Sequence, residues 1–103
     1  MLFFVKVRID VGQMVEMGRR LADGRLDRSG LLTTHCYAAD PEVGLNIWEA
    51  TDAADLRRRL APHRAYYREV LEITPVVPAR EAMELLLGDA AAAPPDTGAP
   101  GPR

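Results

Sequence analysis

The stretch that decides the fold is MLFFVKVRID, residues 1–10. Every odd position from Phe3 to Val11 is apolar, whereas the even positions between them include Lys6 and Arg8. Alternation with a period of two is typical of a β-strand with one buried face. The sequence therefore predicts a first strand whose odd-numbered side chains pack under helices and whose even-numbered side chains lie on the other face.

Periodicity and turn residues predict the remaining elements. We expect a helix over 13–22, a hairpin of strands over 31–39 and 43–50, a helix capped by Asp52 and ended or bent at Pro62, a strand over 68–77 and a short helix over 79–87. The order β-α-β-β-α-β with a final helix indicates the α+β class and the ferredoxin-like arrangement. Two helices then cover one face of an antiparallel four-stranded sheet and leave the other face bare.

The composition changes at residue 88, where GDAAAAPPDTGAPGPR begins. This stretch holds four of the eight prolines and no aromatic or large aliphatic residue. This stretch has no large apolar side chain whose burial could offset the entropy lost when a chain becomes ordered. Residues 88–103 are therefore predicted to be a disordered tail. One domain over 1–87 remains, and a chain of this size buries only about 60–65% of its unfolded surface. A second subunit over the bare face would add burial, so we expect a homodimer.

Charge and cysteine content exclude several classes of protein. A formal charge of −2 argues against a nucleic-acid partner, because proteins that bind nucleic acids normally carry a clustered excess of basic residues. No apolar run approaches the roughly 20 residues that span a bilayer, and charges at Lys6 and Arg8 argue against a signal peptide. The single cysteine, Cys36, excludes an internal disulfide and a cysteine-based zinc site. We therefore expect a cytoplasmic protein without a membrane partner.

The parity of each strand predicts which side chains share the bare face. On the covered face we expect Leu32, Thr34, Cys36, Ala38, Leu45, Ile47, Leu71, Ile73 and Pro75. On the bare face we expect Phe4, Lys6, Arg8, His35, Tyr37, Asn46, Trp48, Val70, Glu72 and Thr74. Aromatic walls with a few polar groups indicate a small-molecule pocket. The alternative is a plain interface with charges paired across strands, such as Arg8 with Glu72.

Two residues of this set have the chemistry of a proton-transfer site. His35 is the candidate proton shuttle, because imidazole titrates near neutral pH, and Glu72 is the candidate general base beside it. Arg8 is expected to hold developing negative charge. Substrate binding is assigned to Phe4, Lys6, Tyr37, Asn46 and Trp48, with Tyr66 at the mouth of the pocket. A structural role is open for each of them. We expect His63 to be exposed and Cys36 to be a small buried core residue.

Cofactor motifs are absent from the sequence. It contains no G-x-G-x-x-G, no Walker loop, no nucleophile elbow and no H-E-x-x-H. We therefore expect no nucleotide, flavin, nicotinamide or metal cofactor. Haem with His35 as its proximal ligand is left open.

Two stretches carry a resemblance to known families. The opening MLFFVKVRID resembles the Met-Leu-Phe-x-Val-Lys strand of the muconolactone isomerase family, and GLNIWEATDAADLRRRLAPHRAYYREVLEITPVVPAREAMELL, which begins at Gly44, is similar to a related bacterial family of small domains. Both families belong to the dimeric α/β-barrel superfamily, in which two ferredoxin-like sheets pack face to face. The resemblance covers residues 1–87. The isomerase family commonly has a histidine after Met-Leu-Phe, where this chain has Phe4.

The resemblance and the candidate residues together predict a function. We expect a cofactor-independent enzyme that isomerises or cyclises an unsaturated or aromatic carbonyl compound by proton transfer at carbon. Two alternatives stay open. The first is a cofactor-free oxygenase that uses the same cavity, and the second is a dimeric binding or accessory module without activity.

Overall fold

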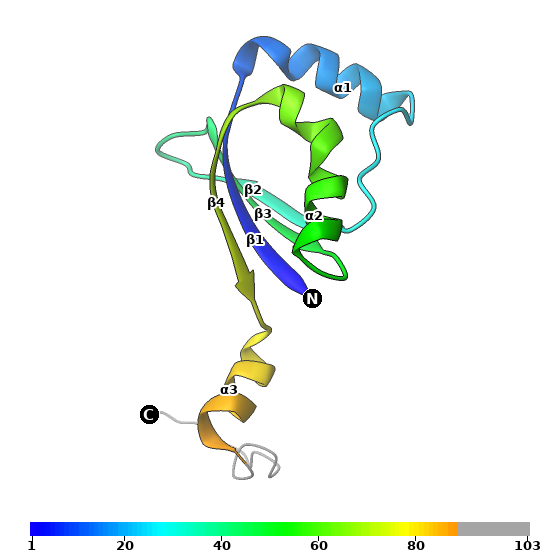
Figure 1. The fold of residues 1–103 in the computed structure, drawn as a ribbon. Coiled ribbons are helices and arrows are strands. Elements are labelled where there is room, and N and C mark those ends of the chain that lie inside the picture. Colours follow the sequence, from blue (N-terminus) through cyan, green and yellow to red (C-terminus); the bar gives the residue numbers. More distant parts are fainter. Residues whose placement is uncertain (89–103) are drawn as a thin grey trace.

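The computed structural model describes residues 1–88, so the predicted tail lies outside the described residues from position 89 onward (Figure 1). The elements are β1 (Leu2–Ile9), α1 (Met14–Ala22), β2 (Leu31–Cys36), β3 (Val43–Glu49), α2 (Ala53–Leu60), β4 (Tyr67–Val76) and α3 (Ala79–Leu87), with 3₁₀ turns at Val11–Gln13 and Ala61–Tyr66. The four strands form an antiparallel sheet in the order β2-β3-β1-β4. This is the ferredoxin-like arrangement, and it confirms the predicted fold class.

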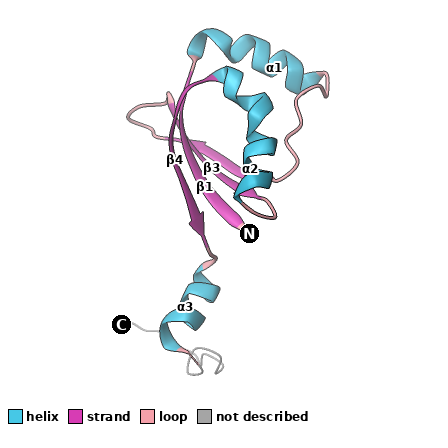
Figure 2. Ribbon diagram, viewed as in Figure 1, coloured by secondary structure: helices cyan, strands magenta, loops and turns pink. Residues whose placement is uncertain are grey.

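Helices α1 and α2 lie on the same side of the sheet (Figure 2). The odd-numbered side chains of β1 face them, as predicted, and Phe3, Val5 and Val7 are buried there. Trp48 lies opposite Phe3 in the register of β3 against β1 and is fully buried. The core beneath α2 is completed by Leu56, Leu60 and Ala50.

The start of α2 is fixed by hydrogen bonds that two aspartate carboxylates accept. Asp52 is the N-cap, and its side chain accepts a hydrogen bond from the backbone N–H of Asp55 at 2.8 Å. The Asp55 carboxylate accepts hydrogen bonds from the backbone N–H of Thr51 and from the guanidinium of Arg59. These bonds hold the pKa of Asp55 well below its usual range. Pro62 lies in the 3₁₀ turn that follows α2, so the predicted end of the helix is confirmed.

The two covering helices differ in how closely they pack on the sheet. Helix α2 buries Leu56 and Leu60, whereas α1 has no buried residue. The apolar row of α1, formed by Met14, Met17 and Leu21, is half-buried. Helix α1 therefore covers the sheet but leaves space between its side chains and the strands.

Bulges in β2 and β4 change which side chains face the helices. The first lies between Leu31 and Thr33, and it turns Leu31 toward the core and leaves Leu32 exposed. The second lies in β4, where Val70 packs against the core and Leu71 is exposed. The predictions that placed Leu32 and Leu71 under the helices are therefore wrong, because a bulge inserts one residue and reverses parity beyond it.

Helix α3 projects from the end of β4, away from α1 and α2 (Figure 1). Its bounds match the prediction, and Gly88 ends it with a φ of +61°. Its large apolar side chains, Met83, Leu85, Leu86 and Leu87, are all exposed. No helix within residues 1–88 has the length and apolar character needed to cross a membrane.

Candidate functional site

Strand register confirms part of the predicted bare face. Phe4 lies opposite Ile47 and Thr74, and Lys6 lies opposite Leu45 and Glu72, so these side chains share the face away from the helices. His35 lies opposite Leu45 and is on this face too. The Lys6 ammonium lies 5.2 Å from the centre of the Tyr37 ring, which places Tyr37 beside it.

The placement of Asn46 and Trp48 on this face was wrong. Trp48 lies opposite Phe3 and Asn46 opposite Val5, and both Phe3 and Val5 point toward the helices. Both side chains are buried, and the Trp48 ring meets the His63 ring edge to face, with their centroids 5.1 Å apart. The aliphatic side chains of Leu45 and Ile47, predicted as core, take the bare face instead.

The predicted catalytic residues do not meet within one chain. His35 is on β2 and Glu72 on β4, which are the two edges of the sheet. Three strand spacings separate them by about 14 Å, too far for a shared proton. Glu72 accepts a hydrogen bond from the Thr74 hydroxyl at 2.7 Å.

Arg8 does not pair with Glu72. Its guanidinium lies 3.4 Å from the carboxylate of Asp40 and 3.8 Å from that of Glu42, at the hairpin between β2 and β3. Arg8 is therefore occupied by two carboxylates and, in this arrangement, does not present a free charge to a ligand.

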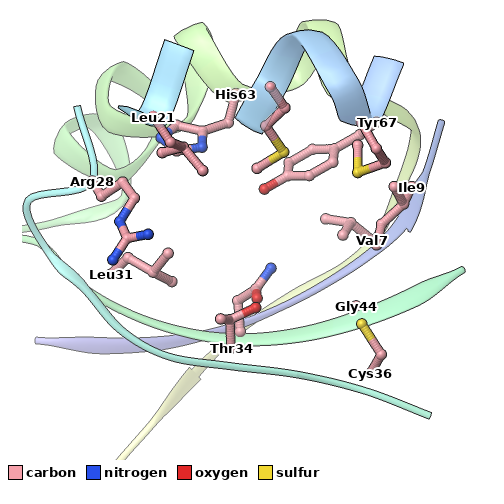
Figure 3. A pocket seen from close by; sticks show the side chains of 13 residues that line it. Val7, Ile9, Leu21, Arg28, Leu31, Thr34, Cys36, Gly44, His63 and Tyr67 are labelled. Carbon is pink, nitrogen blue, oxygen red and sulfur yellow. The ribbon is translucent and has the colours of Figure 1, made fainter. Parts of the chain in front are cut away.

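A cavity of about 160 Å³ lies on the opposite face, between the sheet and α1 (Figure 3). It is lined by Val7, Ile9, Met14, Met17, Leu21, Arg28, Leu31, Thr34, Cys36, Gly44, Asn46, His63 and Tyr67. Protein interiors contain few voids larger than a water molecule. A cavity of this size, with mostly apolar walls and a few polar groups, is the usual form of a small-molecule site.

Burial of the lining residues shows how the cavity is oriented. Asn46, His63 and Gly44 are buried, and they form its closed end. Arg28, Thr34 and Cys36 are exposed, and they lie on or before the edge strand β2. The cavity therefore opens along β2 and closes against the middle of the sheet. Cys36 faces the helices as predicted, but it is exposed at the mouth and not buried.

His63 is buried, which contradicts the prediction that it is exposed. Its Nε2 lies 2.7 Å from the backbone carbonyl oxygen of Asp27. A carbonyl can only accept a hydrogen bond, so Nε2 carries a proton and Nδ1 is the nitrogen that has a lone pair in the neutral ring. Figure 3 shows the His63 ring at the edge of the cavity, in the region of Leu21. The ring is thus fixed in the tautomer and orientation of a general base.

Two further polar groups reach the cavity. Asn46 is 5% exposed, and its side chain lines the cavity. The Tyr67 hydroxyl points into the cavity (Figure 3), and burial raises the pKa of this phenol above its ordinary value of 10.0. Tyr67 therefore stays a neutral hydrogen-bond donor. Tyr66, predicted at the pocket mouth, is buried and does not line the cavity, whereas its neighbour Tyr67 does.

The sequence contains one signal that could have found this site. Gly44, Asn46 and Trp48 share parity, and a Cβ at Gly44 would lie 3.1 Å from a Val7 methyl group. A glycine in a central strand commonly marks a close approach of another group. Within residues 1–88 no three His, Cys, Asp or Glu side chains are arranged to hold a metal ion.

Comparison with known proteins gives one distant likeness. No family model matches the chain, and no curated protein matches it. A crystal structure from Chloroflexus aurantiacus J-10-fl, of a protein provisionally assigned as an antibiotic biosynthesis monooxygenase, is 18% identical and has a TM-score of 0.41. The match covers 75% of this chain and 93% of that chain. This likeness is too distant to indicate a function for the chain. The assignment of the ferredoxin-like fold rests on the strand order of the chain itself.

Proposed function

We propose that the cavity under α1 is the site of a cofactor-independent enzyme that moves a proton at carbon next to a carbonyl group, in an isomerisation or cyclisation. The observation that carries this proposal is the geometry of His63. It is buried at the closed end of the cavity, and its Nε2 is held by the Asp27 carbonyl oxygen. An oriented imidazole with one free nitrogen in an apolar cavity is suited to proton abstraction.

The remaining polar groups suit the other half of the reaction. When Nδ1 of His63 takes a proton from the carbon, the electron pair moves onto the carbonyl oxygen and forms an enolate. The Asn46 amide and the neutral Tyr67 hydroxyl are donors that can stabilise this oxygen. When the substrate has a β,γ double bond, the enolate is conjugated with it, and the imidazolium returns the proton to the γ carbon, which completes an isomerisation and regenerates the base.

The size of the cavity limits the substrate. A cavity of about 150 Å³ lined by apolar side chains holds one benzene molecule. The cavity here has about 160 Å³ and opens along β2. It therefore suits a compound with one ring, whose polar substituents extend toward the mouth.

Deuterium incorporation tests the proposal without knowledge of the product. The full chain is incubated in deuterated water with a panel of one-ring ketones, enones and lactones, and deuterium at carbon is followed by NMR. We expect incorporation above the buffer rate for at least one member of the panel. Failure of every member that binds in the cavity would contradict proton transfer.

The same samples separate the alternative functions. A cofactor-free oxygenase would consume dissolved oxygen and convert substrate only in air. An isomerase would convert substrate at the same rate with and without oxygen. A binding or accessory module would bind ring compounds with neither deuterium incorporation nor oxygen uptake.

Self-association is proposed for the bare sheet face, with a second copy of the chain as its partner. The apolar side chains of this face are Leu2, Phe4, Leu45, Ile47 and Val76, and charges of both signs surround them. A twofold axis brings the same patch together twice, so a patch with both Lys6 and Glu72 can complement itself.

Sedimentation velocity tests the homodimer. We expect a dimer for the full chain at micromolar concentrations and a monomer for Ile47→Glu, because the substitution places two carboxylates in the apolar centre of the interface. Ala54→Glu, on the exposed side of α2, is the matched control and should leave the dimer intact. A wild-type chain that stays monomeric would contradict the proposal.

A further inference from the structure

Arg28 is the positively charged side chain of the cavity lining, and the lining contains no Asp or Glu. Figure 3 shows its guanidinium at one end of the cavity, near Leu31. This end lies toward the mouth, because Arg28 is exposed. A ligand that fills the cavity therefore meets a cation that no acidic lining residue balances.

Most other arginines within residues 1–88 already have carboxylate partners. Arg8 pairs with Asp40, Arg19 and Arg20 with Glu16, Arg25 with Asp23, Arg58 and Arg59 with Asp55, and Arg80 with Glu84. Arg28 has no ion pair within the described part of the chain. The adjacent carboxylate of Asp27 is used locally, because it accepts hydrogen bonds from the backbone N–H and the hydroxyl of Ser29.

Hydrogen bonds fix the backbone on both sides of Arg28. The carbonyl oxygen of Asp27 contacts His63 Nε2 at 2.7 Å, and the carbonyl oxygen of Ser29 accepts from the Arg59 guanidinium at 3.0 Å. The carbonyl oxygen of Arg28 itself accepts from the backbone N–H of Leu31 at 2.9 Å. The loop that orients the His63 ring thus also fixes the backbone from which the Arg28 side chain extends.

We infer that the substrate carries a carboxylate, which the Arg28 guanidinium binds while the ring occupies the cavity. This inference rests on the proposed function for the location of the site, and it adds the substrate class. The planar fork of arginine matches a carboxylate with two parallel hydrogen bonds. The volume of the cavity fits one ring and the Arg28 guanidinium fits one carboxylate, so the expected ligand is a one-ring monocarboxylate.

Binding of benzoate and of its neutral isostere benzamide tests the inference. We expect the wild-type chain to bind benzoate about 10- to 100-fold more tightly than benzamide, the range for hydrogen bonds to a charged group. Arg28→Met should remove this preference, because it weakens benzoate binding much more than benzamide binding. Arg28→Lys keeps the charge without the fork, so it should retain part of the preference. Arg57→Met removes the same charge from the exposed side of α2 and should behave as wild type.

Each outcome decides the inference. Equal affinity for the two probes in the wild-type chain, a preference that survives Arg28→Met, or no binding of benzoate would overturn it. Failure of the proposed function gives a different result. In that case the preference for benzoate depends on Arg28, but no panel compound incorporates deuterium.

Discussion

Replacing His63 with alanine is expected to lower the rate of deuterium incorporation by about 10²- to 10⁴-fold, the usual share of a general acid–base group. The reason is that Nδ1 of His63 is the base assigned to the cavity, with Nε2 held by the Asp27 carbonyl oxygen. The measurement is the initial rate of deuterium incorporation into the best panel substrate, followed by NMR for the wild-type and variant chains.

The matched control is His35→Ala, which removes the exposed histidine on the other face of the sheet. We expect this variant to keep the wild-type rate. His63→Gln is a second variant, because its amide N–H can still donate to Asp27 while the base is lost. A folded His63→Gln chain with undiminished turnover, or a loss of turnover in His35→Ala alone, would remove His63 from the mechanism.

Replacing Trp48 with alanine is expected to destabilise the fold by about 3–5 kcal/mol, the usual cost of truncating a buried aromatic side chain. Trp48 is fully buried, lies opposite Phe3 and contacts the His63 ring. Since small domains are stable by only about 5–15 kcal/mol, this variant should be largely unfolded at moderate urea concentrations. Urea denaturation followed by far-UV circular dichroism measures the effect.

Trp48→Phe separates packing from hydrogen bonding. The indole Nε1 of Trp48 is buried and has no hydrogen-bond partner within residues 1–88. Phenylalanine leaves a smaller void than alanine and removes this unpartnered donor, whose burial has an unfavourable free energy. We therefore expect a much smaller loss of stability than for Trp48→Ala. An equal loss in the two variants would show that the packing of the ring is not the cause.

The alternation of β1 was sufficient to predict which face of this strand is buried. Its odd positions from Phe3 to Val7 are buried as expected, because a strand with four apolar side chains on one side has only one favourable orientation. The last helix was also predicted correctly, since Pro78 and Gly88 mark its two ends. Local patterns of this kind do not depend on distant parts of the chain.

The orientation of β3 could not be predicted in the same way. Both of its rows contain large side chains, Leu45 and Ile47 on one side and Asn46 and Trp48 on the other. Apolarity favoured the aliphatic row for the core, but pairing with β1 sets the parity and places the indole ring there. The assignment of Asn46 and Trp48 to a pocket on the bare face followed from that error.

His63 was missed because its environment is made by residues far away in sequence. Its partners are the Asp27 backbone carbonyl and the Trp48 ring, which come from a loop and from the middle of the sheet. A histidine after Pro62 near a helix end is ordinarily exposed, and nothing local indicates burial. Such a site becomes visible only when the elements are assembled.

The measurement that tests the central claim most directly is an NMR titration of the full chain with benzoate, followed through assigned backbone amides. The proposed site predicts shifts that saturate at Thr34, Asn46, His63 and Tyr67, which line the cavity under α1. It also predicts no saturating shifts at Phe4, His35 and Glu72, which lie on the other face. Saturating shifts confined to that second group would contradict a site beneath α1.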